Sequence, residues 1–351
     1  MIKRLTHFKI QDSPNPVWFR RGKRSDYFGN VIKTFMGRDA LNILLYNITK
    51  KSVLLPAYVC KEVTSEFTKH GYTIYYYDIN SDFSIDIDLI KKKIKEESIE
   101  VFYYVVYFGV CSKYNSLAQQ IKKEIPNTFI IEDRAHYLSN KFDFTNCDAY
   151  VFSFRKTLPI AEGGGLATQI KIEFDYKGKL LANVLPVAMF MKKLLLGYSN
   201  KITRSSIIKD NISQRIRPIS FLSDQIIQKT NYEEEHSFRR ATYIKWVEKL
   251  VSADIEPLFL DLDAEDIPLG CPIRVNNAAK LQSELEEIGF YLKRHWPLSE
   301  DLKTVAPNSV KISSNIITLP IYKGINQKEQ DEILSYLVNL IHKQKNEHIY
   351  L

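Results

Sequence analysis

The feature that most constrains the fold of this sequence is a regular alternation of two kinds of segment from about residue 30 to residue 170. Short runs rich in β-branched and aromatic residues alternate with longer stretches of helical periodicity, which is the pattern of βαβ units around a largely parallel sheet. The expected strands are 52–55, 73–77, 101–107, 128–131 and 149–152. The expected helices are 40–48, 61–70, 87–95 and 116–123. Because these intervals leave room only for crossover helices, the sequence predicts an α/β fold with a mostly parallel central sheet.

The rest of the chain predicts a helical middle followed by a smaller α+β block. Strand signals are few between about residues 175 and 250, and this part ends in a long charged helical stretch at 231–250. The expected elements after it are strands at 272–275 and 316–320 and helices at 278–288 and 327–343. We therefore expect a large α/β domain over residues 1–245, with its helical segment at about 175–245, and a small C-terminal α+β domain over residues 246–351.

Composition excludes several other classes of protein. The hydrophobic share of 45% and the 13 glycines and 13 prolines rule out disordered and collagen-like chains. The cysteines are widely spaced and form no CxxC pair, so we expect no disulfide framework, no structural zinc site and a reducing cytoplasm as the location. These cysteines are Cys60, Cys111, Cys147 and Cys271. The N-terminus has no apolar core, and two lysines split the apolar stretch at 184–198, so we expect neither a signal peptide nor a membrane span.

The net charge of +8, from 49 Lys and Arg against 41 Asp and Glu, is compatible with nucleic acid, an anionic membrane face or phosphorylated small molecules as partners. The lysines are scattered among acids, as at 91–100, and are not clustered with aromatic residues as nucleic-acid binding requires. We therefore expect no nucleic acid and no membrane as partner, and we assign most of this charge to a solvated surface. A basic binding protein is the alternative from another functional class.

Ligands of open α/β sheets bind at the carboxyl ends of the strands, so residues just past those ends are candidates for chemistry. Gly37, Arg38 and Asp39 form a glycine turn at the expected start of a helix. Backbone N–H groups at such a start can hold a phosphate, and glycine permits close approach. Without further context, a glycine before a helix is more often an ordinary turn.

A second candidate is the apolar strand that runs directly into Glu132 and Asp133. A carboxylate at a strand end can stay ionised opposite a protonated ring nitrogen, as a pyridinium cofactor requires. Taken alone, Asp133 is more typical of a helix N-cap. His136 follows three residues later and is close enough along the chain to reach the same ligand, although an isolated histidine is more often structural.

The most informative stretch runs from Phe152 to Gly165. Lys156 follows an apolar strand and precedes a triple glycine at 163–165, which suits Schiff-base chemistry where burial or neighbouring charge lowers the pKa of the lysine. The glycines allow a tight turn beside a planar ligand. Without further context, Lys156 is one of many surface lysines and the glycines form a flexible hairpin. A last candidate, the loop at 295–298, either faces a substrate or simply packs Trp296.

These pieces occur in the order used by fold-type I pyridoxal-phosphate (PLP) enzymes. More narrowly, the sequence resembles the DegT/StrS family of sugar aminotransferases from about Gly37 to the C-terminus. The segments that carry the resemblance are MGRDAL at 36–41, VLLPAYVC at 53–60, IEDRAH at 131–136, the serine, lysine and EGG residues between 153 and 164, and SNIITLPI at 314–321.

The resemblance implies a role for each matched residue. Lys156 is the lysine that holds PLP, Asp133 pairs with the pyridine nitrogen, and His136 lies near the ring hydroxyl. The remaining cofactor-binding residues are Gly37, Arg38, Asp39 and Ser153 toward the phosphate and Tyr58 and Cys60 toward the ring. The candidates for substrate contact are Tyr107, Arg155, Arg217, His295 and Trp296. Arg38, Arg134 and Arg155 belong to the segments expected around the phosphate groups.

The resemblance further implies an aminotransferase that moves an amino group from an amino acid such as glutamate to a nucleotide-linked keto sugar, and it implies a homodimer. The sequence departs from the family pattern in two places. The spacing from Ser153 to Lys156 is two residues shorter than usual, and Arg155 stands beside the lysine, where its charge favours the neutral amine. The nearest candidate for the family's partner-subunit segment is 217–220. These departures leave an alternative open: the protein is a divergent member of the family that binds the cofactor but catalyses a different reaction or none.

Overall fold

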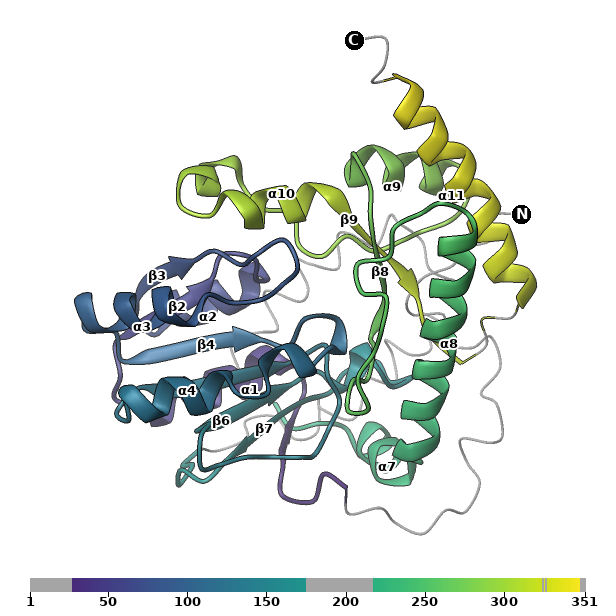
Figure 1. The fold of residues 1–351 in the computed structure, drawn as a ribbon. Coiled ribbons are helices and arrows are strands. Elements are labelled where there is room, and N and C mark those ends of the chain that lie inside the picture. Colours follow the sequence, from purple (N-terminus) through teal and green to yellow (C-terminus); the bar gives the residue numbers. More distant parts are fainter. Residues whose placement is uncertain (1–26, 175–216, 324, 326, 348–351) are drawn as a thin grey trace.

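The structure of the protein is a computed structural model that describes residues 27–174, 217–323, 325 and 327–347. Within them, one seven-stranded sheet has the order β1-β7-β6-β5-β4-β2-β3 (Figure 1). Its strands are β1 (Ile32–Thr34), β2 (Ser52–Pro56), β3 (Thr73–Tyr77), β4 (Val101–Val105), β5 (Phe129–Arg134), β6 (Ala149–Phe152) and β7 (Gly164–Thr168). The pairs from β3 through β6 are parallel, and β7 pairs antiparallel with β6 and with β1. The expected α/β class is confirmed.

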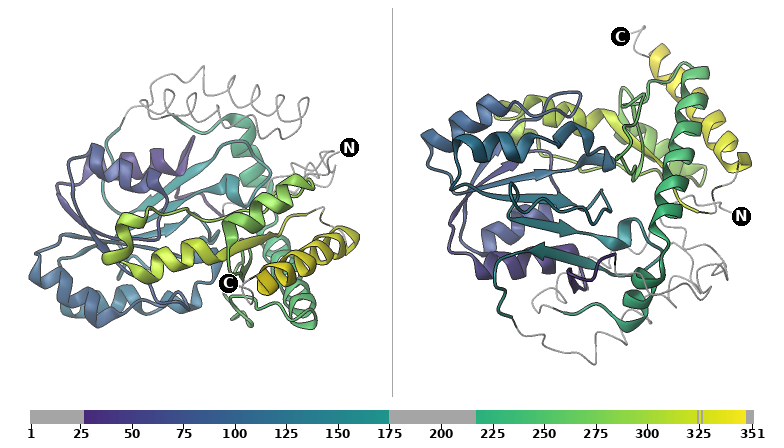
Figure 2. Two further views of the ribbon diagram at one scale, coloured as in Figure 1. Left: turned by 90° about the horizontal axis from the view of Figure 1, so that it is seen from above. Right: turned by 60° about the horizontal axis from the view of Figure 1, so that its bottom comes forward.

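Helices cover both faces of this sheet. They are α1 (Gly37–Asn47), α2 (Lys61–Lys69), α3 (Ile87–Glu96) and α4 (Leu117–Glu124). α1 packs with α2 and α3 packs with α4, and Figure 2 shows the two pairs on opposite faces. Because β4 is buried along its whole length and β5 along nearly all of it, the inner strands have apolar side chains on both faces, as expected for a covered parallel sheet.

The C-terminal half is built around a two-stranded antiparallel sheet of β8 (Gly270–Arg274) and β9 (Ile316–Pro320). Its helices are α7 (Phe221–Lys229), α8 (Tyr232–Ser252), α9 (Ala278–Glu287), α10 (Pro307–Asn315) and α11 (Gln327–Glu347). Trp246 of α8 is fully buried and donates a hydrogen bond to the carbonyl oxygen of Pro320 at 2.9 Å, which fixes α8 against β9. The division expected near residue 245 falls inside α8 and stays a prediction.

The C-terminal half docks on the sheet through the turn after β4. Phe108 and Gly109 both have positive φ, and their carbonyl oxygens accept hydrogen bonds from the backbone N–H groups of Leu269 and Ile267. A Cβ on Gly109 would lie 1.9 Å from the carbonyl oxygen of Ile267, so this close approach requires glycine. The docking places the loop at 295–298 beside the carboxyl ends of the parallel strands, as its contacts with Tyr58 and His136 show.

The expected strands and helices agree with the structure to within a few residues, but three elements were not expected. These are β1, β7 and α10. The triple glycine is not a flexible turn, as its alternative reading had it, because Gly164 and Gly165 begin strand β7, which pairs antiparallel with β6. No helix in the described part of the chain is long and apolar enough to cross a membrane. Residues 175–216 lie outside the described residues. They include the apolar stretch at 184–198 and most of the helical middle that was expected at about 175–245.

Candidate functional site

Asp133 is the fifth residue of β5, between β4 and β6, and its side chain is 5% exposed. Its Oδ2 accepts a hydrogen bond from the Tyr103 hydroxyl at 2.7 Å, and its Oδ1 accepts one from the Ala135 N–H at 2.7 Å. Burial raises the pKa of Asp133, while the charge of Lys156 and the two hydrogen bonds oppose this shift. Asp133 lies within a strand, so the helix N-cap reading is wrong.

Lys156 ends a short 3₁₀ turn, Phe154–Lys156, directly after β6. Burial lowers the pKa of Lys156, the neighbouring charge of Arg155 lowers it further, and Cys60 and Asp133 act in the opposite direction. The Nζ atom lies 5.7 Å from the centroid of the Trp296 ring. A lysine whose pKa is lowered and that lies beside a buried carboxyl is a nucleophile suited to imine chemistry.

The start of α1 meets the lysine loop and β7 in a very close contact. A Cβ on Gly164 would lie 2.2 Å from the carbonyl oxygen of Met36 and 2.4 Å from the Gly37 nitrogen. A Cβ on Gly37 would lie 2.8 Å from the carbonyl oxygen of Phe152 and 3.7 Å from the Ser153 Cβ. Only glycines permit this approach, which places the N-terminus of α1 beside Ser153. The positive end of a helix dipole in a glycine-lined turn is suited to an anion.

Two charged side chains accompany this turn. Asp39 accepts a hydrogen bond from the Met36 N–H at 2.9 Å, and burial raises the pKa of Asp39 to about 7. Arg217 lies beside the same turn of its own chain, since its carbonyl oxygen accepts the Phe35 N–H at 2.9 Å and its guanidinium lies 6.0 Å from the Phe35 ring centroid. The charges of Arg38 and Arg217 both oppose the upward shift of the Asp39 pKa.

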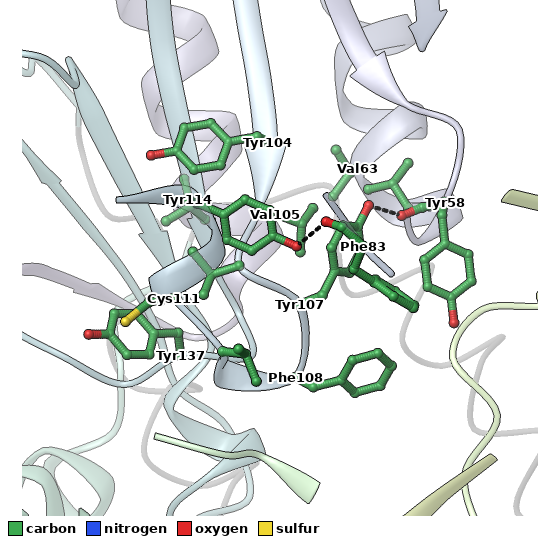
Figure 3. Packing of buried hydrophobic residues seen from close by; sticks show 14 of the residues in the cluster. Tyr58, Val63, Phe83, Tyr104, Val105, Tyr107, Phe108, Cys111, Tyr114 and Tyr137 are labelled. Carbon is green, nitrogen blue, oxygen red and sulfur yellow. Dashed lines mark hydrogen bonds between the residues drawn. The ribbon is translucent and has the colours of Figure 1, made fainter. Parts of the chain in front are cut away.

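Aromatic residues from both halves of the chain meet next to Lys156. The Trp296 ring stacks on His136, with centroids 5.0 Å apart and an interplanar angle of 21°, and the His295 ring lies 4.8 Å from His136. The Tyr58 hydroxyl donates to the carbonyl oxygen of His295, and the Tyr107 hydroxyl donates to that of Tyr58 at 2.6 Å. Figure 3 shows Tyr58 and Tyr107 within this buried packing. The loop at 295–298 therefore packs beside Lys156 and His136, and its contact with a substrate stays a prediction.

The protonation of His136 follows from its backbone contact. The Phe108 N–H donates to His136 Nδ1 at 3.3 Å, so the neutral ring carries its proton on Nε2. Cys60 is the N-cap of α2, and burial raises the pKa of its thiol to about 11, with the charge of Lys156 acting against this rise. The structure thus brings Lys156, Asp133, His136, Cys60 and Trp296 into one neighbourhood.

Arg134 does not belong to this neighbourhood, contrary to expectation. Its Nε donates to Glu132 Oε1 at 2.5 Å, and its guanidinium lies 4.2 Å from the centroid of the Tyr150 ring. The Tyr104 hydroxyl donates to the other oxygen of Glu132. Because side chains alternate along a strand, Glu132 and Arg134 share the face opposite Asp133.

Solved structures with the same fold carry names from one class of enzyme. A sugar aminotransferase of Streptococcus pneumoniae, Spr1654, in its PLP form aligns with a TM-score of 0.64 and 18% identity over 97% of this chain and 98% of that chain. The aminotransferase TlmJ of Streptoalloteichus hindustanus aligns with a TM-score of 0.68 and 14% identity over 98% and 93%. A DegT DnrJ EryC1 StrS aminotransferase of Brucella abortus aligns with a TM-score of 0.60 and 18% identity over 90% and 87%.

This chain shares the fold of these solved aminotransferases. At these identities the likeness establishes the fold alone, and it confirms the expected fold-type I architecture. No protein-family model matches the sequence, and no curated protein matches it.

Two buried residues next to the site of this aminotransferase fold were not foreseen from the sequence. Tyr103 is one, through its bond to Asp133. Arg239 is the other: its Nη2 donates to the carbonyl oxygen of Thr157, next to Lys156, at 2.8 Å, and its Nε pairs with Glu235 at 2.9 Å. The spacing of Glu235 and Arg239 on a helix was visible in the sequence, but such pairs are usually exposed.

Proposed function

We propose that this protein is a PLP-dependent aminotransferase that transfers an amino group to a sugar. The observation that carries this proposal is the arrangement of Asp133 and Lys156 at the ends of adjacent strands, β5 and β6, with the glycine-lined start of α1 beside them. The fold neighbours, which are named aminotransferases and include the sugar aminotransferase Spr1654, support the same assignment.

The residues present fit PLP. The close packing of Gly37 and Gly164 leaves the N-terminus of α1 and Ser153 to hold the phosphate, with Arg38 next in the same turn. Each oxygen of Asp133 has one protein donor, and since a carboxylate has about four acceptor positions, it retains the capacity to accept a ring N–H. The Nε2–H of His136 is a donor suited to the ring oxygen.

When bound, PLP supplies an electron sink for negative charge at the carbon of the amino substrate. Asp133 would hold the proton on the ring nitrogen. Lys156 would hold the cofactor through Nζ and, once the amino group of the substrate has displaced it, its free amine would move a proton to and from the substrate carbon. The aromatic residues Tyr58, Tyr107 and Trp296 exclude water and orient the ring.

The finer features of the proposal come from the family resemblance. The donor is glutamate, and the acceptor is a nucleotide-linked keto sugar whose phosphates are met by Arg38 and Arg155. The enzyme acts as a homodimer in the cytoplasm, and Arg217 and its neighbours lie at the phosphate turn where a partner subunit approaches. His295 fixes the loop that carries Trp296, through its bonds to Tyr58 and Thr318.

The direct test is spectroscopic. Purified protein reconstituted with PLP is expected to be yellow, and borohydride is expected to fix the cofactor on the peptide that contains Lys156. The variant Lys156→Ala should show no fixation, while Lys141→Ala, a lysine outside the site, should behave as wild type. A protein that remains colourless with added PLP would refute the proposal.

A second measurement separates an aminotransferase from a divergent cofactor-binding protein. Glutamate added to the yellow protein is expected to convert the bound cofactor to its amine form, with a loss of the visible absorption band. Failure of glutamate, glutamine and alanine alike would favour the divergent alternative. Binding of nucleic acid in place of PLP would favour the basic binding protein.

A further inference from the structure

Tyr103 lies in the middle of β4, has no exposed surface, and is held in place from several sides. The Tyr77 hydroxyl donates to its carbonyl oxygen at 3.2 Å, and the Phe67 ring packs edge-on against it at 5.7 Å between centroids. Its own hydroxyl donates to Asp133 Oδ2 at 2.7 Å. The packing of the Tyr103 ring therefore holds its hydroxyl in a fixed position as a donor to the Asp133 carboxylate.

The register of the sheet explains this contact. β4 and β5 are parallel, with Tyr103 opposite Ile131 and Val105 opposite Asp133. Residues two apart on a strand share a face, so Tyr103 and Asp133 are diagonal neighbours on one face of the sheet. The long tyrosine ring spans the diagonal and brings its hydroxyl to the carboxylate.

The adjacent tyrosine provides an internal comparison. The Tyr104 hydroxyl donates to Glu132 Oε2 at 2.5 Å on the opposite face of the same two strands. Glu132 also accepts from Arg134 Nε at 2.5 Å, whereas the hydrogen-bond donors that the structure records for Asp133 are the neutral Tyr103 hydroxyl and Ala135 N–H. Both pairs join a tyrosine hydroxyl of β4 to a carboxylate of β5, but Tyr104 stands directly opposite Glu132, whereas Tyr103 reaches Asp133 across a diagonal. They also differ in their charge partner, because a hydrogen-bonded arginine completes the Glu132 pair.

This difference matters because the cation nearest to Asp133 is Lys156, whose reactive form is the neutral amine. Burial disfavours the ionised form of Asp133, and the positive charge of Lys156 counteracts this only while it is present. The Tyr103 hydroxyl is a donor that stays in place in both states of Lys156. A hydrogen bond to a charged group stabilises it about twice as strongly as one between neutral groups.

We propose that Tyr103 is a positioning residue that keeps Asp133 ionised and aligned, and through it keeps the ring nitrogen of the cofactor protonated. The role rests on the proposed function, since it concerns how the bound PLP is held in its electron-accepting form.

The test uses Tyr103→Phe, which removes one oxygen atom, in protein loaded with PLP labelled with ¹⁵N at the ring nitrogen. The ¹⁵N chemical shift reports directly whether this nitrogen is protonated. Wild-type protein is expected to give the protonated signal at neutral pH, and Tyr103→Phe is expected to move it toward the neutral pyridine position. The rate of the glutamate half-reaction should fall about 10- to 100-fold, the range expected for one hydrogen bond to a charged group.

The matched control is Tyr104→Phe. It removes the same hydroxyl from the next residue of the same strand, so it should lower stability comparably and leave the ¹⁵N signal and the half-reaction rate as in wild type. Reconstitution with a PLP analogue that has carbon in place of the ring nitrogen is the second control. With this analogue Tyr103→Phe should cost nothing further, because there is no ring nitrogen to protonate.

A second variant keeps the test independent of folding. Site-specific 3-fluorotyrosine at position 103 keeps the ring and its packing while making the hydroxyl a stronger donor, and it should keep the ring nitrogen protonated at neutral pH as in wild type. A wild-type ¹⁵N signal in Tyr103→Phe, or an equal shift in Tyr104→Phe, would overturn the role of Tyr103 alone. If wild-type protein takes up no PLP, the proposed function fails, and the role of Tyr103 fails with it.

Discussion

The two faces of the β4–β5 pair hold two buried carboxylates under different conditions. On one face, Glu132 accepts from the Tyr104 hydroxyl and from the guanidinium of Arg134, which also donates to the carbonyl oxygens of Ser139 and Lys141. On the other face, Asp133 accepts from the Tyr103 hydroxyl and the Ala135 N–H, near a lysine whose pKa is lowered.

Two adjacent residues of one strand therefore differ in role: Glu132 stabilises the fold, and Asp133 is available for chemistry. A buried carboxylate that is hydrogen-bonded to an arginine is needed for stability, because breaking the ion pair leaves an uncompensated buried charge. A buried carboxylate held by neutral donors keeps capacity for one more charged partner. Asp133 therefore has the arrangement that a cationic ring nitrogen needs, and Glu132 does not.

The largest predicted contrast comes from removing the charge of each carboxylate. Asp133→Asn should lower amino transfer about 100- to 10,000-fold, the range for losing control of a proton in catalysis, with little loss of stability. Glu132→Gln should do the opposite: it leaves Arg134 without its charge partner and should cost about 3–5 kcal/mol of stability, while activity per folded molecule is retained. Half-reaction rates and urea unfolding of both variants measure the two effects.

This contrast has a clear contrary outcome. If Glu132→Gln lost activity as steeply as Asp133→Asn while remaining folded, the two faces would not be functionally distinct. Thermal unfolding of the two variants, followed before the rates are measured, ensures that the comparison is made between folded proteins.

A second prediction concerns the arginine of the structural face. Arg134→Met should cost about 3–5 kcal/mol, because it leaves the buried carboxyl group of Glu132 without its charge partner and with the Tyr104 hydroxyl as its remaining side-chain donor. The double variant Arg134→Met with Glu132→Leu should recover most of this loss, since replacing both members of a buried pair by apolar groups is often nearly neutral. Urea unfolding curves of the single and double variants measure their free energies of unfolding. A double variant less stable than the single one would show that the carbonyl contacts of Arg134, and not its charge, dominate.

The sequence located Asp133 and Lys156 because both follow apolar runs, and the carboxyl ends of parallel strands are where ligands bind. It placed Arg134 wrongly because the expected strand ended at 131, whereas β5 continues to Arg134. Strand alternation therefore extends through that residue and turns it away from Asp133. An error of three residues at a strand end was enough to assign an arginine to the wrong face.

Tyr103 could not be found from the sequence for a related reason. The run VFYYV has two adjacent tyrosines, and which of them faces Asp133 depends on the register of β4 against β5, where a shift of one residue exchanges the faces. Strand β7 was missed because its glycines have low strand propensity, and its extended state is set by pairing with β6 and β1. Both features depend on tertiary contacts.

A third prediction leaves both carboxylates intact and concerns the close contact between Gly164 and the start of α1. Gly164→Ala places a Cβ 2.2 Å from the Met36 carbonyl and 2.4 Å from the Gly37 nitrogen, so the start of α1 must move. PLP affinity is expected to fall at least about tenfold, the cost of roughly one lost hydrogen bond to the phosphate. Gly71→Ala is the control: its φ is +72° and its Cβ meets nothing within 4 Å, so it should lower stability by about 1–2 kcal/mol with unchanged PLP affinity. Equal affinity in both variants would contradict the phosphate role of the turn.

A fourth prediction concerns Asp39, a third buried carboxyl, whose pKa burial raises from the ordinary 3.8 to about 7. Between these values the folded state keeps a proton that the unfolded state has lost, so the contribution of Asp39 to stability is greatest below pH 4 and declines as the pH rises to 7, by up to about 1.4 kcal/mol per unit. Asp39→Asn keeps an acceptor for the Met36 N–H and has no titrating group. The stability of wild type relative to this variant should therefore fall between pH 5 and pH 7, as measured by urea unfolding. Parallel pH curves for the two proteins would show that the carboxyl at the phosphate turn is already ionised in this range.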